Sequence, residues 1–192
     1  MSGNQIDLFG APQPAWPDGF RYQRDVLDAE TEAAMLAHVR ALPFREFEFQ
    51  GYTAKRRVIS FGWQYDFDAR RLRKVDDMPE FLRELREHAA RFAGMRAAAL
   101  QHVLVMEYGA GAAIGWHRDK EVFGEIVGIS LLSSCTFRLR RAAEHGWERV
   151  SLIAEPRSAY LLSGEAREEW EHSIPGVEAL RYSVTYRNLR ER

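Results

Sequence analysis

Residues 117–119 read His-Arg-Asp, and residues 181–187 read Arg-Tyr-Ser-Val-Thr-Tyr-Arg, with His172 between the two stretches. In an extended backbone, side chains two residues apart point to the same side. His117 and Asp119 can therefore face one point together, while the arginine between them faces away. The later stretch alternates strictly, although an amphipathic edge strand would alternate in the same way. Its polar face carries Arg181, Ser183, Thr185 and Arg187.

Short strand-like runs surround these two stretches from Gln101 onward, with turn residues between them. Several short strands at this spacing predict an all-β sandwich or barrel. The runs are residues 102–108, 125–130, 135–140, 150–153, 159–162 and 182–189. The second half of the chain is therefore expected to form a β core.

Two amphipathic helices are expected ahead of this core. Residues 28–42 carry apolar side chains at roughly helical spacing and stop before Pro43. A second helix is expected to run from Pro79 to Gly94. Between the helices, residues 44–68 are aromatic and basic, with glycine interruptions that predict loops and short strands. The pattern is that of an α+β, mainly β chain with two helices packed on a C-terminal β core.

The length of 192 residues suits one sizeable domain. No apolar run approaches the roughly 20 residues that a membrane span needs. The N-terminus lacks the basic start and apolar centre of a secretory signal. Cys135 is the single cysteine, so an internal disulfide is excluded. It is most simply a small buried hydrophobe on a strand, and its isolation fits a reducing, cytoplasmic compartment.

The formal net charge is −1, so the chain lacks the overall positive excess that nucleic-acid-binding proteins often show. Any nucleic-acid binding must then depend on local charge. Two basic clusters are candidates, although each taken alone is more simply a solvated face. They consist of Lys55, Arg56 and Arg57, and of Arg138, Arg140 and Arg141.

Two imidazoles and one carboxylate are the three protein ligands of a non-haem Fe(II) oxygenase, and they leave one side of the ion open. His117, Asp119 and His172 supply this set. The same residue types also bind zinc. The arginines at 181 and 187 favour iron, because guanidinium groups match the carboxylates of a keto acid bound beside it. The remaining histidines lack a partner at ligand spacing and are interpreted as structural or solvated. They are His38, His88, His102 and His145.

The segment from Val105 to Leu189 resembles the AlkB family of Fe(II)/2-oxoglutarate dioxygenases. It contains Tyr108-x-x-Gly111-x-x-Ile114-x-x-His117-x-Asp119, then Leu162-Ser163-Gly164-Glu165-Ala166-Arg167, His172 and the arginine-flanked strand. This combination covers nearly half of the chain and is more specific than the three metal ligands alone. The resemblance implies a double-stranded β-helix, a jelly-roll-like core, with N-terminal helices and a nucleotide-recognition lid.

The resemblance also implies a role for each residue of the site. The implied iron ligands are His117, Asp119 and His172, and the implied 2-oxoglutarate contacts are Tyr108, Arg181, Ser183 and Arg187. Arg181 would bind the distal carboxylate, and Arg187 would lie at the other end of the co-substrate or substrate pocket. A core position is an equally good interpretation of Tyr108.

One departure from the family pattern lies two residues before the tyrosine. Family members often carry an asparagine there, and this chain has Met106. A hydrogen bond to the co-substrate carboxylate is then lost or supplied by another group. We expect weaker co-substrate affinity from this change, and not loss of the chemistry.

Residues 44–68 lie where the family places its lid. A flipped base needs an aromatic face on which to stack, and Tyr52 is the best candidate, with Trp63 and Tyr65 behind it. Arg56 could reach a substrate phosphate or base, and Glu121 matches a family position that contacts the target base. A small hydrophobic core under the helices is the alternative for the aromatic residues and the simpler interpretation of Trp63.

The implied activity is oxidative removal of alkyl groups from damaged DNA or RNA bases, with release of formaldehyde, succinate and CO2. Fe(II) would be the cofactor, and 2-oxoglutarate and O2 the co-substrates. The nucleic acid would be single-stranded or carry a flipped base. The family pattern does not fix the substrate class, so tRNA modification and protein demethylation stay open. A binding module without catalysis is a further alternative, against which the complete triad and both arginines argue.

Residues 1–20 hold three prolines and predict an extended arm, which leaves residues 21–192 as a single domain. The arm contains Gln5-Ile6-Asp7-Leu8-Phe9, which resembles the peptide by which bacterial replication and repair proteins dock on the sliding clamp. The alternative is that Leu8 and Phe9 simply pack on the domain. Nothing in the sequence demands more than a monomer.

Overall fold

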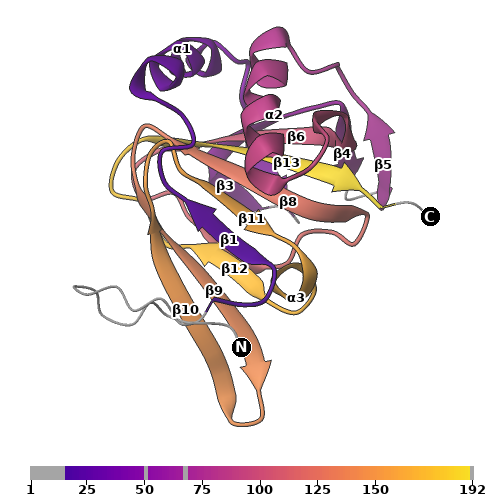
Figure 1. The fold of residues 1–192 in the computed structure, drawn as a ribbon, viewed down its shortest axis with the longest axis vertical. Coiled ribbons are helices and arrows are strands. Elements are labelled where there is room, and N and C mark those ends of the chain that lie inside the picture. Colours follow the sequence, from indigo (N-terminus) through magenta and orange to yellow (C-terminus); the bar gives the residue numbers. More distant parts are fainter. Residues whose placement is uncertain (1–15, 50–51, 67–68, 191–192) are drawn as a thin grey trace.

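The computed structural model describes residues 16–49, 52–66 and 69–190, and its elements are drawn in Figure 1. Two long helices cover one face of a seven-stranded sheet, and a four-stranded sheet packs on the other face. The helices are α1 (Ala29–Arg40), α2 (Glu80–Ala93) and the short α3 (Gly164–Glu168), with a 3-10 turn at Ala97–Ala99.

The seven-stranded sheet is antiparallel, with strand order β1-β11-β8-β13-β6-β3-β2. Its strands are β1 (Phe20–Gln23), β2 (Arg45–Phe49), β3 (Tyr52–Phe61), β6 (Leu100–Tyr108), β8 (Phe123–Leu131), β11 (Ala159–Leu162) and β13 (Arg181–Leu189). The arginine-flanked strand β13 lies at the centre, paired with β6 and β8. It is therefore not an edge strand.

The four-stranded sheet has the order β10-β9-β12-β7 and is also antiparallel. Its strands are β7 (Ile114–His117), β9 (Cys135–Ala143), β10 (Gly146–Ala154) and β12 (Glu171–Ile174). Strands β9 and β10 form a long hairpin whose tip extends below the rest of the molecule in Figure 1. A separate two-stranded sheet joins β4 (Trp63–Asp66) to β5 (Arg71–Lys74).

The alternation expected for residues 181–187 is confirmed by two hydrophobic cores. Tyr182, Val184 and Tyr186 pack with the apolar faces of α1 and α2 in one core. The other core lies between the two sheets, where Phe137 of β9 packs with residues such as Tyr108 of β6. Every residue from 181 to 187 is buried, so β13 separates an apolar layer from a polar interior.

Local sequence explains where both long helices begin and end. The Asp28 carboxylate accepts a hydrogen bond from the Thr31 backbone N–H at 2.7 Å and caps the start of α1. Gly94 closes α2 with φ at 72°, a left-handed conformation that glycine adopts without steric cost. These boundaries agree closely with the helices expected from the sequence.

The expectation of loops and short strands for residues 44–68 is wrong in one respect. Strand β3 is 10 residues long and pairs with β6, so it extends the large sheet. Its apolar end, Val58 to Phe61, pairs with residues 103–106 of β6, and β-branched and aromatic side chains favour such a half-buried surface. Burial against β6, 45 residues later in the chain, stabilises a strand that the glycine interruptions obscure.

Two further expectations concern Cys135 and the chain ends. Cys135 is buried on β9, as predicted. None of the helices in the described part of the chain is long and apolar enough to cross a membrane. The pentapeptide at residues 5–9 and the rest of the arm up to residue 15 lie outside the described residues.

Candidate metal centre

Neighbouring strands of the small sheet bring the predicted ligands together. His172 of β12 is the direct cross-strand partner of His117 at the end of β7, and their ring centroids lie 4.2 Å apart. Asp119 follows just after β7. One ligand atom from each of the three residues lies within 4.8 Å of the others, so the group could hold a metal ion. Its donor types are those of the facial triad that non-haem iron prefers.

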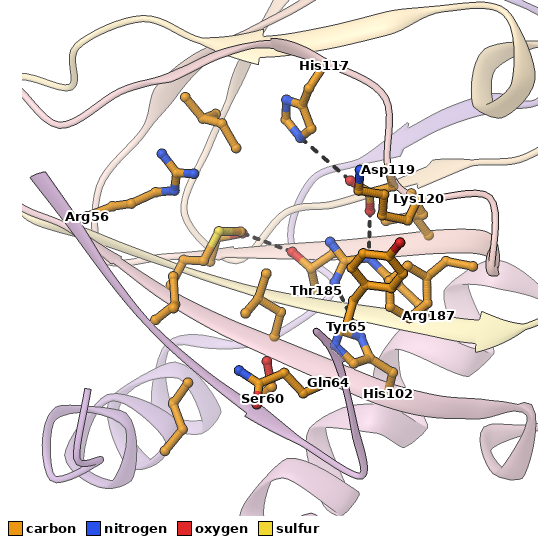
Figure 2. A pocket seen from close by; sticks show the side chains of 18 of the residues that line it. Arg56, Ser60, Gln64, Tyr65, His102, His117, Asp119, Lys120, Thr185 and Arg187 are labelled. Atoms are coloured by element: carbon orange, nitrogen blue, oxygen red, sulfur yellow. Dashed lines mark hydrogen bonds and ion pairs between the residues drawn. The ribbon is translucent and has the colours of Figure 1, made fainter. Parts of the chain in front are cut away.

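Outer contacts orient two of these ligands. The His117 Nδ1 atom donates to the Gly115 carbonyl oxygen at 2.9 Å, which leaves Nε2 to face the Asp119 carboxylate at 3.5 Å. Arg187 Nε donates to the other Asp119 oxygen at 2.5 Å, and Figure 2 shows this pair among the side chains that line the pocket. Such partners fix the tautomer and aim of metal ligands.

The electrostatics keep the ligands in the forms that bind a cation. Burial alone would raise the pKa of Asp119, but Arg187 and the His117 hydrogen bond hold that pKa well below its usual range. Burial lowers the pKa of His172 to about 3, and the neighbouring His117 contributes to the same shift. A deprotonated carboxylate and a neutral imidazole are the states that coordinate metals.

A third histidine, His102, contacts Arg187, which in turn contacts Asp119. His102 of β6 is buried, and its ring is tilted against that of Phe123 with 4.7 Å between the centroids. Its Nδ1 atom lies 3.3 Å from the Arg187 guanidinium. Burial and the Arg187 charge hold the pKa of His102 well below 6.5, so its Nδ1 accepts a hydrogen bond from the guanidinium. His102 therefore positions Arg187, a role the sequence interpretation missed. His102, Leu104, Met106 and Tyr108 alternate along β6 and therefore share one face of the strand. All four line the pocket, so this alternation would have indicated that His102 points inward.

The second predicted arginine has the environment of an anion site. Arg181 is 1% exposed, donates to the Ser130 hydroxyl at 2.9 Å and lies 4.9 Å from the centre of the Tyr108 ring. Its Nε and Nη1 atoms are buried and have no hydrogen-bond partner among the described residues. A buried guanidinium without an anion is costly, so a carboxylate ligand such as that of 2-oxoglutarate fits here.

A pocket of about 1000 Å³ opens above the three ligands. Tyr108, Ser183 and Arg187 line it, while Arg181 lies against Tyr108 and outside the lining. The Tyr108 hydroxyl donates to the Met106 sulfur at 3.4 Å, and burial raises the pKa of Tyr108. Three of the four co-substrate contacts expected from the sequence therefore line the pocket from β6 and β13, and Arg181 lies beside one of them.

At the mouth of the pocket, the structure brings together only some of the predicted substrate residues. Arg56 lines the pocket and donates to the Ala113 carbonyl at 3.3 Å. Trp63 and Glu121 do not line it, and the Trp63 ring instead carries Lys74, whose Nζ lies 5.6 Å away. The Tyr52 side chain lies outside the described residues.

Two other side chains narrow the opening. Lys120, next to the candidate metal ligand Asp119, places its ammonium 5.5 Å from the centre of the Tyr65 ring on β4, and both side chains are among the pocket-lining residues drawn in Figure 2. This contact joins the ligand loop to the lid. Nothing in the spacing of the sequence indicated that these two residues meet.

The loop that carries Asp119 is held from below by Arg167 of α3. The Arg167 guanidinium is buried and donates to the backbone carbonyls of Gly124, Lys120 and Phe123 at 2.7 to 2.9 Å, with a longer bond to that of Asp119 at 3.3 Å. One side chain thus bonds to four carbonyls, two in the loop before β8 and two at the start of that strand. Its position in the Ser-Gly-Glu-Ala-Arg motif was noted from the sequence, but its role was not.

Comparison with known proteins places this geometry in context. Residues 19–187 match the family model of the 2OG-Fe(II) oxygenase superfamily. The chain is 30% identical over 146 residues to the "Alkylated DNA repair protein ALKBH8 homolog" of Arabidopsis thaliana. That match covers 64% of this chain and 42% of the relative, so the chain spans less than half the length of this relative.

Two solved structures share the fold. The structure of OsALKBH1 matches with a TM-score of 0.67 and 16% identity over 92% of this chain and 99% of that one. A prolyl-4-hydroxylase from Pseudomonas putida matches with a TM-score of 0.59 and 14% identity over 90% of this chain and 94% of that one. At these identities the matches show the jelly-roll fold alone.

Proposed function

The chain belongs to the 2OG-Fe(II) oxygenase superfamily, and we propose that it removes alkyl groups from nucleic-acid bases by oxidation. It is a dioxygenase of the AlkB type that uses Fe(II), 2-oxoglutarate and O2. We propose that its substrate is an alkylated nucleic acid. This proposal is supported by the similarity to a relative named as an alkylated DNA repair protein, and above all by the charge around the pocket.

The distribution of charge carries the proposal. Over the whole chain, 27 basic residues nearly balance 28 acidic ones. Among the described residues that line the pocket, seven are Arg or Lys and three are Asp or Glu. The basic ones are Arg45, Arg56, Arg73, Lys74, Arg118, Lys120 and Arg187. A local positive field in a nearly neutral protein suits a phosphate-bearing substrate.

The bound metal and co-substrate would supply oxidation of an N-alkyl C–H bond coupled to decarboxylation of 2-oxoglutarate, so that succinate, CO2 and formaldehyde are released. His117, Asp119 and His172 would hold the iron. Arg181 would bind a carboxylate of 2-oxoglutarate, with Tyr108 and Ser183 beside it. The role of the remaining side chains would be to orient the alkylated base and to exclude water.

Metal and co-substrate binding is tested first. Anaerobic titration of the protein with Fe(II) and 2-oxoglutarate should give a metal-to-ligand charge-transfer band. His117→Ala and Asp119→Ala should each abolish the band and turnover while leaving the far-UV circular dichroism unchanged. Turnover retained by either variant would refute the ligand assignment.

Substrate class is tested by formaldehyde release. Methylated single-stranded DNA, methylated tRNA and methylated histone-like peptides are offered to the iron-loaded enzyme. We expect the enzyme to turn over at least one of the nucleic acids. If it turned over the peptides and neither nucleic acid, base dealkylation would be wrong. Turnover of tRNA alone would favour RNA modification, the second activity compatible with this site.

A further inference from the structure

The outer face of the four-stranded sheet carries arginine and tryptophan side chains that the metal and co-substrate sites do not use. Phe137 of β9 is buried between the two sheets, so its neighbours Arg138 and Arg140 point to the outer side. Cross-strand pairing of Arg140 with Arg149 places the outer side chains of β10 beside them. Trp147, two residues before Arg149, shares this face.

These side chains form a continuous stack. The Arg140 guanidinium carbon lies 4.0 Å from the centre of the Trp147 ring and 4.4 Å from that of Trp116 on β7, and Arg138 lies 4.9 Å from the Trp116 ring. Two tryptophans, on β7 and β10, thus flank the two arginines of β9 on this face. We call Trp116, Arg138, Arg140, Trp147 and Arg149 the Arg–Trp face.

The charges on this face exceed what the fold itself neutralises. Arg140 donates to Glu171 at 2.6 Å, and Arg138 donates to the neutral Ser173 hydroxyl at 3.0 Å. Arg149 is exposed and, within the described ranges, has neither a hydrogen bond nor an ion pair. Like charges placed directly opposite on neighbouring strands are destabilising, yet Arg149 stands opposite Arg140. An anionic ligand would relieve this repulsion.

An aromatic ring is also presented to solvent. Trp147 is 42% exposed, which makes it one of the large hydrophobic side chains that the described part of the chain leaves in water. One side of its ring is covered by Arg140. The rest is available for stacking, and base–aromatic stacking is how proteins hold single strands without reading their sequence.

The Arg–Trp face begins at the pocket. Trp116 lines the pocket mouth and directly precedes the metal ligand His117. Strand β7 is the edge of its sheet, with β12, β9 and β10 following in order. Since neighbouring strands lie about 4.8 Å apart, the face runs roughly 14 Å away from the mouth. A strand with one base in the pocket can therefore continue across it.

We propose that the Arg–Trp face binds the single-stranded nucleic acid that flanks the alkylated nucleotide. Arginines would contact successive phosphates, and Trp147 would stack on a base. This inference rests on the proposed function and extends it by giving the enzyme a second contact surface outside the pocket. An acidic protein segment would match the charge but would leave the exposed ring without a partner, so the tryptophan favours a nucleic acid.

The test compares long and short ligands on the iron-loaded enzyme. Fluorescence anisotropy measures the affinity of an unmodified single-stranded oligonucleotide for wild type, Trp147→Ala and Arg149→Gln at several salt concentrations. We expect Trp147→Ala to weaken binding on the order of tenfold. Arg149→Gln should weaken it and lower the salt slope by about 0.7, the value for one phosphate contact on a single strand. Formaldehyde release from a methylated trinucleotide, too short to cover the face, should stay at the wild-type rate in both variants.

The control variant is Arg96→Gln, which removes an exposed arginine remote from the pocket lining and should leave the affinity unchanged. Wild-type affinity in Trp147→Ala and Arg149→Gln would overturn the proposal even if base dealkylation holds. Failure of the proposed function has a separate signature, because wild type would then release no formaldehyde from any nucleic acid. An oligoglutamate peptide that bound the face as tightly as the oligonucleotide, and lost affinity in Trp147→Ala, would assign the face to an acidic protein segment and overturn it as well.

Discussion

Asp119 is a carboxylate whose side chain is 9% exposed, and Arg187, whose side chain is 8% exposed, is the cation that makes its burial tolerable. Removing one partner of a buried pair leaves the other uncompensated, at a cost of about 3 to 5 kcal/mol. Arg187→Met should therefore lower the free energy of unfolding of the metal-free protein by about that amount in urea titrations. The matched control is Arg83→Met, which breaks the exposed pair with Glu80 and should cost less than about 1 kcal/mol. Equal losses in the two variants would contradict the role given to Arg187.

Met106 occupies a position where related enzymes often carry asparagine, and it lines the pocket beside Tyr108. An amide there could donate a hydrogen bond to the co-substrate carboxylate, and one such bond contributes about 1 kcal/mol, or roughly fivefold in affinity. We expect Met106→Asn to lower the KM for 2-oxoglutarate by about that factor. Met106→Leu keeps the shape without the amide and should leave the KM near the wild-type value. A higher KM in Met106→Asn would show that the thioether is the better partner of Tyr108.

His102 and His172 are both buried in the neutral form, which links stability to pH. Their pKa values lie below 6.5 in the folded state, and that of His172 is about 3. Below pH 6.5 the unfolded chain binds protons that the folded chain does not, so the free energy of unfolding falls as the pH drops toward 3. Each histidine contributes up to about 1.4 kcal/mol per pH unit.

Chemical unfolding of the metal-free protein between pH 7 and pH 5 measures this slope. His102→Gln should reduce the slope by about half, since one of the two buried imidazoles is gone. His145→Gln, at an exposed histidine in the β9–β10 turn, is the matched control for the substitution itself. A slope unaffected by His102→Gln would mean that His102 is not buried neutral.

At this scale, the sequence predicts residues whose chemistry is local and misses those defined by distant partners. His117 and Asp119 can be recognised by their spacing of two residues. His172 can be recognised by its position in the sequence ahead of the arginine-flanked strand. His102 could not be paired from the sequence, because its partner Arg187 lies 85 residues later. The contact between Lys120 and Tyr65 across the pocket mouth could not be predicted either, because the two residues lie far apart in the sequence.

Among the elements, α3 is only five residues long, yet its Arg167 holds the loop that carries Asp119, a candidate metal ligand. Arg167 reaches four carbonyls of the segment 119–124 with one planar guanidinium. A lysine offers a point charge and cannot reproduce this fork. We expect Arg167→Lys to weaken Fe(II) binding about 10- to 100-fold, the usual effect of losing an outer contact of a metal site. Fe(II) titration checks this against Arg190→Lys, an exposed arginine near the same loop whose change should have little effect.

The elements differ in how far the sequence predicts them. Strand β11 is found at its expected residues, 159–162, because a four-residue apolar run bounded by turns is too short for a helix and fits a fully buried strand. Strand β12 is also four residues long but holds Glu171, His172 and Ser173, polar residues that do not look like a strand. Its extended shape comes from pairing with β7 and β9. Tertiary pairing decides such segments, and single-sequence patterns do not contain it.

For the molecule as a whole, the separation of charge matters more than its sum. A net charge of −1 gives no general attraction to nucleic acid, while the pocket mouth gathers basic side chains. Binding of a single strand should then weaken linearly with the logarithm of salt concentration, by about 0.7 per phosphate contacted. We expect this dependence in the KM for a methylated oligonucleotide and not in that for the methylated nucleoside, which has no phosphate. Formaldehyde release over a salt series measures both, and equal salt dependence for the two substrates would show that the basic residues act on the co-substrate or the fold and not on phosphates.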